Sequence, residues 1–114
     1  MDLTGTWDVV SSPDFDDDYL HLEVEPYVKL YRVGNRIEGE YHLGLQYGDL
    51  DGQMKGDNRA MFRFEGMDEM DPVDGIATAT LVLSVTEGLE GGRLIFVVSY
   101  RPGDEYTFEC ERRR

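Results

Sequence analysis

One stretch decides the fold: Tyr27–His42, which reads YVKLYRVGNRIEGEYH. Gly34-Asn35 is a favoured two-residue hairpin loop, and it brings Val33 opposite Arg36. Loop length sets the register, and the register sets which side chains share a face. One face is then apolar and the other polar, as a half-buried antiparallel sheet requires. The predicted pairs are Val28–Tyr41 and Leu30–Gly39 on the apolar face, with Lys29–Glu40 and Tyr27–His42 on the polar face.

Two further hairpins follow the same pattern further along the chain. Loops of three residues at Lys55-Gly56-Asp57 and Pro102-Gly103-Asp104 place apolar residues opposite apolar residues. The predicted pairs are Leu50–Phe62, Gly52–Ala60, Asp49–Arg63 and Gln53–Arg59 in the first hairpin, and Tyr100–Tyr106, Val98–Phe108, Phe96–Cys110 and Arg101–Glu105 in the second. Three consecutive-strand hairpins predict an antiparallel meander.

Short alternating segments between dispersed glycines complete an all-β pattern. An acidic loop at Met67–Asp74 is expected to link two of the strands. Eight meandering strands usually close into a barrel, which leaves no exposed sheet edge. We therefore predict one domain, residues 1–114, folded as an eight-stranded antiparallel up-and-down β-barrel. The predicted strands are Thr4–Val10, Leu20–Val33 with a bend near Pro26, Arg36–Leu43, Gln46–Met54, Asn58–Glu65, Gly75–Thr86, Arg93–Arg101 and Glu105–Arg112.

Composition narrows the functional classes. The chain has 114 residues, 40% of them hydrophobic, which is enough for one core. Eleven basic against 24 acidic residues give a net charge of −13, which disfavours nucleic acids and anionic membranes as partners. A single cysteine, Cys110, forms no internal disulfide. The opening MDLTGTWDVV carries no basic leader, so a cytoplasmic location is expected. A removed signal peptide would make the same chain extracellular.

The opening strand carries a family resemblance. Leu3-Thr4-Gly5-Thr6-Trp7 and the later Ile37-Glu38-Gly39-Glu40-Tyr41 resemble motifs of the calycin group, which includes lipocalins, fatty-acid-binding proteins and avidins. The resemblance implies a calycin-like barrel with Tyr41 facing a ligand and Arg112 packed over Trp7. Biotin is not the implied ligand, because Val9, Pro13 and Leu43 replace polar residues of the avidin pocket and Trp7 is the only tryptophan.

The predicted interior gives the leading functional hypothesis. Tyr41, Tyr100 and Tyr106 face inward on the predicted registers, together with Trp7 and Phe62. Buried tyrosine hydroxyls need hydrogen-bond partners, which a ligand, the protein itself or trapped water can supply. An eight-stranded barrel is just wide enough for its own side chains or one small ligand, so both a filled core and a cavity remain open. We expect a non-enzymatic module that holds a small, mostly apolar ligand.

Catalytic, metal and cofactor chemistry find little support. No nucleophile–base grouping, P-loop or dinucleotide fingerprint is present, and the carboxylates face outward on the predicted registers. Asp14, Asp16 and Asp18 have the spacing of a calcium loop, but Tyr19 stands where such a loop needs glycine. We expect no catalytic residue, no metal site and no cofactor. Cys110 is expected to be an inert core thiol.

The outer face of two late strands is unusually apolar. Ile76, Val82, Ile95 and Val97 point outward if their neighbours point inward, so something is expected to cover them. The expected cover is a second copy of the chain, giving a homodimer, or else the chain's own Ser11–Glu25 segment. The alternative function is an acidic interaction or inhibitor protein that docks a basic protein partner through its outer surface.

Overall fold

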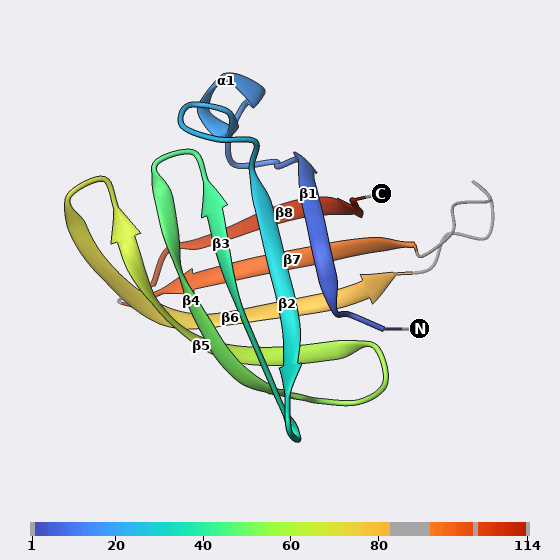
Figure 1. Cartoon of the computed structure of the whole chain (residues 1–114). Coiled ribbons are helices and arrows are strands. Elements are labelled where there is room, and N and C mark those ends of the chain that lie inside the picture. The colour runs from blue at the N-terminus through green and yellow to red at the C-terminus, as the bar shows by residue number, and fades with distance from the viewer. Residues whose placement is uncertain (1, 83–91, 102, 114) are drawn as a thin grey trace.

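The computed structural model describes residues 2–82, 92–101 and 103–113, and its strands form a closed barrel (Figure 1). Each strand pairs antiparallel with the next along the chain, and the last pairs with the first. The predicted all-β, up-and-down architecture with eight strands is confirmed. The elements are β1 (Gly5–Ser11), α1 (Asp17–Leu20), β2 (Tyr27–Val33), β3 (Arg36–Leu43), β4 (Gln46–Met54), β5 (Arg59–Asp68), β6 (Asp71–Val82), β7 (Arg93–Tyr100) and β8 (Glu105–Arg112).

The core of the barrel is built from side chains on the inner faces of its strands. Figure 1 shows β2 and β3 crossing steeply over β6, β7 and β8, so two walls face each other across the interior. Inward residues alternate along each strand, which is why nearly every second residue is buried. The largest of the fully buried side chains are Trp7, Tyr41, Phe62, Phe64, Phe96 and Phe108.

The Tyr27–His42 hairpin has the predicted register in full. Val33 pairs with Arg36, and the apolar and polar pairs lie on opposite faces as the alternation required. The bounds of β3 and β4 also agree with the predicted strands. A two-residue loop leaves no freedom for another register, so this part of the fold is readable from sequence.

The other two predicted registers are wrong by two residues. In the β4–β5 hairpin Leu50 pairs with Phe64, and in the β7–β8 hairpin Phe96 pairs with Phe108. Backbone hydrogen bonds close wider loops than the three residues assumed, from Lys55 N–H to the carbonyl of Arg59 and from Tyr100 N–H to that of Asp104. A shift of two preserves the faces, because side chains alternate with period two. The predicted inward residues therefore still point inward.

The predicted long strand Leu20–Val33 is wrong in its first part. Residues 17–20 form the short helix α1, and the strand begins only at Tyr27. Asp16 accepts a hydrogen bond from the backbone N–H of Tyr19 at 2.9 Å, which caps the helix. Asp17 and Asp18 in the first turn also stabilise the helix, because negative side chains interact favourably with the positive end of the helix dipole.

The predicted acidic link at residues 67–74 is also wrong. Strand β5 continues to Asp68 and β6 starts at Asp71, so only Glu69-Met70 turns the chain. Glu69 adopts a φ of 58°, the left-handed conformation that such a tight turn needs. The predicted end of the next strand, at Thr86, lies outside the described residues.

Candidate functional site

One end of the barrel is closed by the segment between β1 and β2, residues 12–26, which we call the mouth segment. Its aromatic residue Phe15 stacks on Tyr19 at 4.5 Å between ring centroids and contacts Tyr106 at 4.9 Å and Phe108 at 5.8 Å. Leu20 at the end of α1 is fully buried. The mouth segment therefore inserts apolar groups into the end of the core.

Few polar contacts hold the mouth segment to the strands. The backbone N–H of Thr107 donates to Asp14 at 2.7 Å, and the N–H of Gly44 donates to the carbonyl of Leu20 at 3.1 Å. Nε2 of His42 on β3 lies 2.9 Å from the Oε1 atom of Glu23. The Oγ atom of Ser12 also donates to the carbonyl of Thr107, and the N–H of Val9 donates to the carbonyl of Pro26 at 3.0 Å. Of these bonds, those of Asp14 and Glu23 are solvent-exposed, and exposed polar contacts contribute little stability each.

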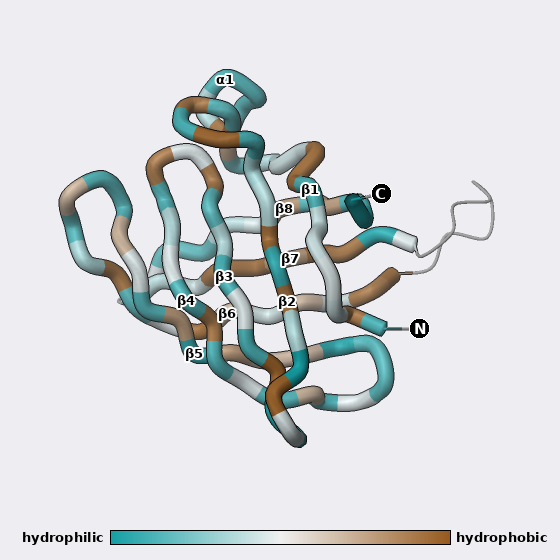
Figure 2. The backbone as a smooth tube through the Cα atoms, in the orientation of Figure 1, coloured by the Kyte–Doolittle hydropathy of each residue, from teal (hydrophilic) through white to brown (hydrophobic). Residues whose placement is uncertain are grey.

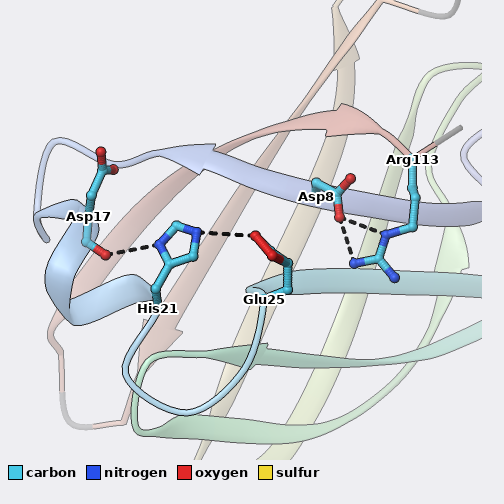
Figure 3. A network of polar contacts seen from close by, with 5 residues as sticks. All are labelled: Asp8, Asp17, His21, Glu25 and Arg113. Atoms are coloured by element: carbon cyan, nitrogen blue, oxygen red, sulfur yellow. Dashed lines mark hydrogen bonds and ion pairs between the residues drawn. The ribbon is translucent and has the colours of Figure 1, made fainter.

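The solvent side of the same segment carries a separate polar network (Figure 3). His21 lies between the carbonyl oxygen of Asp17, at 3.0 Å, and the carboxylate of Glu25, at 3.4 Å. Beside it, the guanidinium of Arg113 contacts Asp8 at 2.6 Å, and that hydrogen bond raises the pKa of Arg113. The network ties α1 to the turn that leads into β2, and it points away from the core.

Beneath the mouth segment lies a chain of buried hydrogen bonds. The Tyr100 hydroxyl donates to the Oε1 atom of Gln46, and the Nε2 group of Gln46 donates to the Tyr19 hydroxyl at 3.1 Å. Gln46 is 1% exposed, so both of its polar atoms depend on these tyrosines. Gln46, Tyr19 and Phe15 are not among the site residues predicted from the sequence. One sequence signal could have indicated them: two aromatic residues, Phe15 and Tyr19, lie within an otherwise acidic segment, where they are the side chains most suited to burial.

Tyr41 lies next to this chain but takes no part in it. Its hydroxyl is buried and has no hydrogen-bond partner among the residues that the structure describes. Its ring covers Gly48, its cross-strand neighbour, where an added Cβ atom would lie 2.9 Å from the hydroxyl. Phe64 and Phe96 pack on the ring at 6.1 and 5.8 Å. An unpaired buried hydroxyl costs about 1–3 kcal/mol, so it requires an explanation.

Electrostatics keep the mouth tyrosines neutral. Burial, and after it the charge of Asp68, raises the pKa of both Tyr41 and Tyr100. Burial and the neighbouring Asp71 raise the pKa of Asp68 as well, while the nearby Tyr100 hydroxyl acts in the opposite direction. Tyr41 and Tyr100 can therefore donate and accept hydrogen bonds as neutral phenols.

Three of the five predicted ligand residues lie together, and the other two, Phe62 and Trp7, lie elsewhere in the core. The structure brings Tyr41, Tyr100 and Tyr106 together: the rings of Tyr100 and Tyr106 meet edge to face at 5.4 Å, and Phe64 bridges Tyr100 to Tyr41. Phe62 is buried on the inner face of β5, opposite Gly52 and Ala77.

Trp7 lies in a separate cluster. It is fully buried, and its indole N–H donates to the carbonyl of Leu3 at 2.8 Å. The guanidinium of Arg112 lies 4.3 Å from the indole centroid and donates to the carbonyl of Thr4 at 2.6 Å. The packing of Arg112 over Trp7 that the calycin resemblance implied is thus present.

Apart from the mouth, the outer wall of the barrel has a hollow across β3, β4, β5 and β6. It has a volume of about 550 Å³ and is open to solvent. Gly39 and Gly75 are among the residues that line it, and carboxylates outnumber cations in the lining. The charged residues that line it are Glu38, Asp49, Asp51, Glu65, Asp74, Arg63 and Arg101.

The outer apolar face expected from the sequence is present on β6 and β7. Ile76 and Val82 are 41% and 47% exposed, and Ile95 and Val97 are half-buried. The mouth segment lies at the end of the barrel, so it does not cover these residues. Figure 2 shows that β7 is hydrophobic along most of its length, consistent with apolar residues on both of its faces.

Two features, a metal-binding cluster and a membrane-spanning helix, are absent from the part of the chain that the structure describes. No group of three or more His, Cys, Asp or Glu side chains is arranged to hold a metal ion. No helix among residues 2–82, 92–101 and 103–113 is long and apolar enough to cross a membrane.

Comparison with protein-family models gives no match for this chain, and comparison with curated proteins gives none, so its function is argued from the site itself.

Proposed function

We propose that this protein is a binding module that takes a small, mostly apolar ligand at the mouth of its barrel. The observation that carries the proposal is the buried Tyr41 hydroxyl, which lacks a hydrogen-bond partner among the described residues. A polar group of a ligand would supply that partner. Tyr100 and Tyr106 would contact the ligand from the opposite wall.

Phe15 marks the place that the ligand would take. Its ring fills the space beside Tyr106 and Phe108, and the neighbouring Asp14 holds this part of the mouth segment to β8 by an exposed hydrogen bond from the N–H of Thr107. Displacement of this ring would open an aromatic-walled space without breaking any strand pairing. The ligand's apolar body would replace Phe15, which makes the mouth segment a competitor for the site.

Charge restricts the ligand further. Tyr106 has a pKa raised by burial and by the carboxylates of Asp104, Asp68 and Asp14, all of which surround the mouth. An anionic ligand would meet these charges as well as the overall charge of −13. The ligand that fits is therefore neutral or cationic, with one polar group that can accept or donate a hydrogen bond.

The first experiment is native mass spectrometry of the protein as purified from cells. A ligand held at the mouth would appear as extra mass on the folded protein that is lost on denaturation. A neutral apolar fluorophore, N-phenyl-1-naphthylamine, then provides a titration on refolded, ligand-free protein. Phe15→Ala should bind this probe more tightly than the wild type, because it removes the competing ring.

Matched phenylalanine variants separate a ligand contact from a general effect. Tyr41→Phe should lower the affinity for the co-purified ligand, because the hydroxyl that contacts its polar group is gone. Tyr47→Phe is the control, since Tyr47 is 44% exposed on the outer wall. A clean apo mass together with no binding of the probe by Phe15→Ala would refute the proposal.

A second candidate function is favoured by the outer hollow. Its excess of carboxylates, with the exposed ring of Tyr31 at one side, fits the lysine and arginine side chains of a basic protein partner. Binding of an oligo-arginine peptide should then weaken steeply with salt. Asp49→Asn should weaken it further, whereas Glu105→Gln on β8 should not. Binding equal at low and high salt would argue against this candidate.

A further inference from the structure

The outer surface of β5, β6, β7 and β8 has an ordered charge pattern that the sequence did not reveal. The strand registers arrange its residues in rows across the four strands. In the three rows that cross all four strands, apolar and hydroxyl side chains occupy the two central strands. Arg59 and Arg63 lie on the β5 side and Glu105 and Glu109 on the β8 side, while Arg93 lies on β7 in the fourth row. The rows are Arg63–Ile76–Ser99–Glu105, Met61–Thr78–Val97–Thr107 and Arg59–Thr80–Ile95–Glu109, followed by Val82–Arg93–Glu111.

Four of the rim charges, those of Arg59, Arg63, Glu105 and Glu109, make no ion pair among the described residues. Arg59 and Arg63 have no ion-pair partner among the described residues, although the chain carries more than twice as many acidic as basic residues. Among the described residues, the carboxylate of Glu105 accepts a hydrogen bond from the Ser99 hydroxyl, and the carboxylate of Glu109 accepts one from the Ser11 hydroxyl.

The described residues of these four rows carry a balanced charge, unlike the molecule as a whole. Their three arginines balance their three glutamates, whereas the chain carries −13. Two copies can therefore approach each other here without the repulsion that their acidic walls would cause. A basic partner, in contrast, would gain no net attraction from a neutral face.

We propose that this face binds a second copy of the chain about a two-fold axis that runs along β6 and β7. Such an axis places the arginine rim of one copy against the glutamate rim of the other. Arg63 would then meet Glu105 of the partner subunit, and Arg59 would meet the partner's Glu109. An axis across the strands would instead place arginine against arginine, so the charge pattern selects one orientation.

The size of the face sets the expected strength. Four strands span about 14 Å, and the four rows extend about 20 Å along them. Even with the rim side chains, this is less than the roughly 800 Å² that each partner contributes to a standard interface. We therefore expect a reversible dimer that forms at micromolar concentration, with Ile76, Val82, Ile95 and Val97 at its centre.

A charge exchange tests the orientation. Sedimentation velocity over a range of micromolar concentrations should show a dimer for the wild type. Arg63→Glu alone and Glu105→Arg alone should each weaken the dimer about tenfold, because each places like charges together. The double variant should restore the dimer to within about threefold of the wild type, because the pair is re-formed with its charges exchanged. Lys29→Glu on β2 is the control, as it changes the net charge as much as Arg63→Glu does.

Each outcome decides the proposal. Rescue by the double variant, with no effect of Lys29→Glu, supports the two-fold described. A monomer at every concentration overturns the dimer. A dimer that neither single reversal weakens overturns this face, and weakening without rescue overturns the predicted pairing.

Discussion

Replacing Tyr41 with phenylalanine should stabilise the ligand-free protein, although tyrosine is fully buried in the core. The hydroxyl lacks a hydrogen-bond partner among the described residues, and a buried unsatisfied group of this kind costs about 1–3 kcal/mol. Removing one oxygen leaves a small void that offsets part of the gain. We expect the free energy of unfolding to rise by about 1 kcal/mol.

Tyr100→Phe is the matched comparison, and its effect should have the opposite sign. The Tyr100 hydroxyl donates to Gln46, which is buried, so its loss leaves a buried amide oxygen unsatisfied. The expected cost is about 1–2 kcal/mol. Two chemically identical substitutions in neighbouring rings should therefore differ by about 2–3 kcal/mol, with only the hydrogen-bond partner as the cause.

The assay is equilibrium unfolding in urea, on protein refolded from denaturant so that no ligand is retained. With a slope of about 2 kcal/mol per molar urea, Tyr41→Phe should raise the midpoint by about 0.5 M and Tyr100→Phe should lower it by about 0.5–1 M. A lower midpoint for Tyr41→Phe at unchanged slope would refute the reasoning, because the hydroxyl would then be contributing stability in the free protein.

The same pair of variants has a predicted pH dependence. Burial raises the pKa of Tyr41 above its value in the unfolded chain, which is about 10. The folded state then retains a proton that the unfolded state loses. The free energy of unfolding of the wild type is therefore constant below about pH 10 with respect to this group, and it falls as the pH rises further. Tyr41→Phe has no hydroxyl to ionise and does not lose this stability, so its advantage over the wild type should widen above about pH 10.

Three further predictions concern the rest of the barrel. Arg112→Ala should lower the free energy of unfolding by about 2 kcal/mol and change the fluorescence of Trp7, because it removes both a cation–π contact and hydrogen bonds to backbone carbonyls. Urea unfolding followed by tryptophan fluorescence would measure both, and an unchanged spectrum would contradict the contact. Gly52→Ala should destabilise by about 2 kcal/mol or more in the same assay, since the added Cβ would lie 1.9 Å from the carbonyl oxygen of Met61. Burial raises the pKa of Cys110, so its thiol should resist a thiol-reactive dye in the native protein and react on unfolding; rapid native labelling would show that the thiol is accessible.

The sequence alone determined which side chains face inward. Alternation with period two assigns a face to each residue, and it did so correctly for Tyr41, Tyr100 and Tyr106 even where the register was wrong. The two-residue loop Gly34-Asn35 also determined one full register, because so short a loop permits only one pairing. Wider loops permit several pairings that keep the same faces. The registers predicted for the hairpins around residues 55–58 and 101–104 were therefore wrong by two residues.

Only the tertiary structure decided which polar groups meet. Gln46, Tyr19 and Tyr100 come from β4, α1 and β7, and no local pattern in the sequence predicts that they share hydrogen bonds. The mouth segment was misread because its helix depends on a capping aspartate and on burial of Leu20 against distant strands. The arginine and glutamate rims likewise exist only once strand pairing aligns β5 with β8 across two intervening strands. Hydrogen bonds and charge pairs act over a few ångströms in space, whereas sequence patterns report distance along the chain.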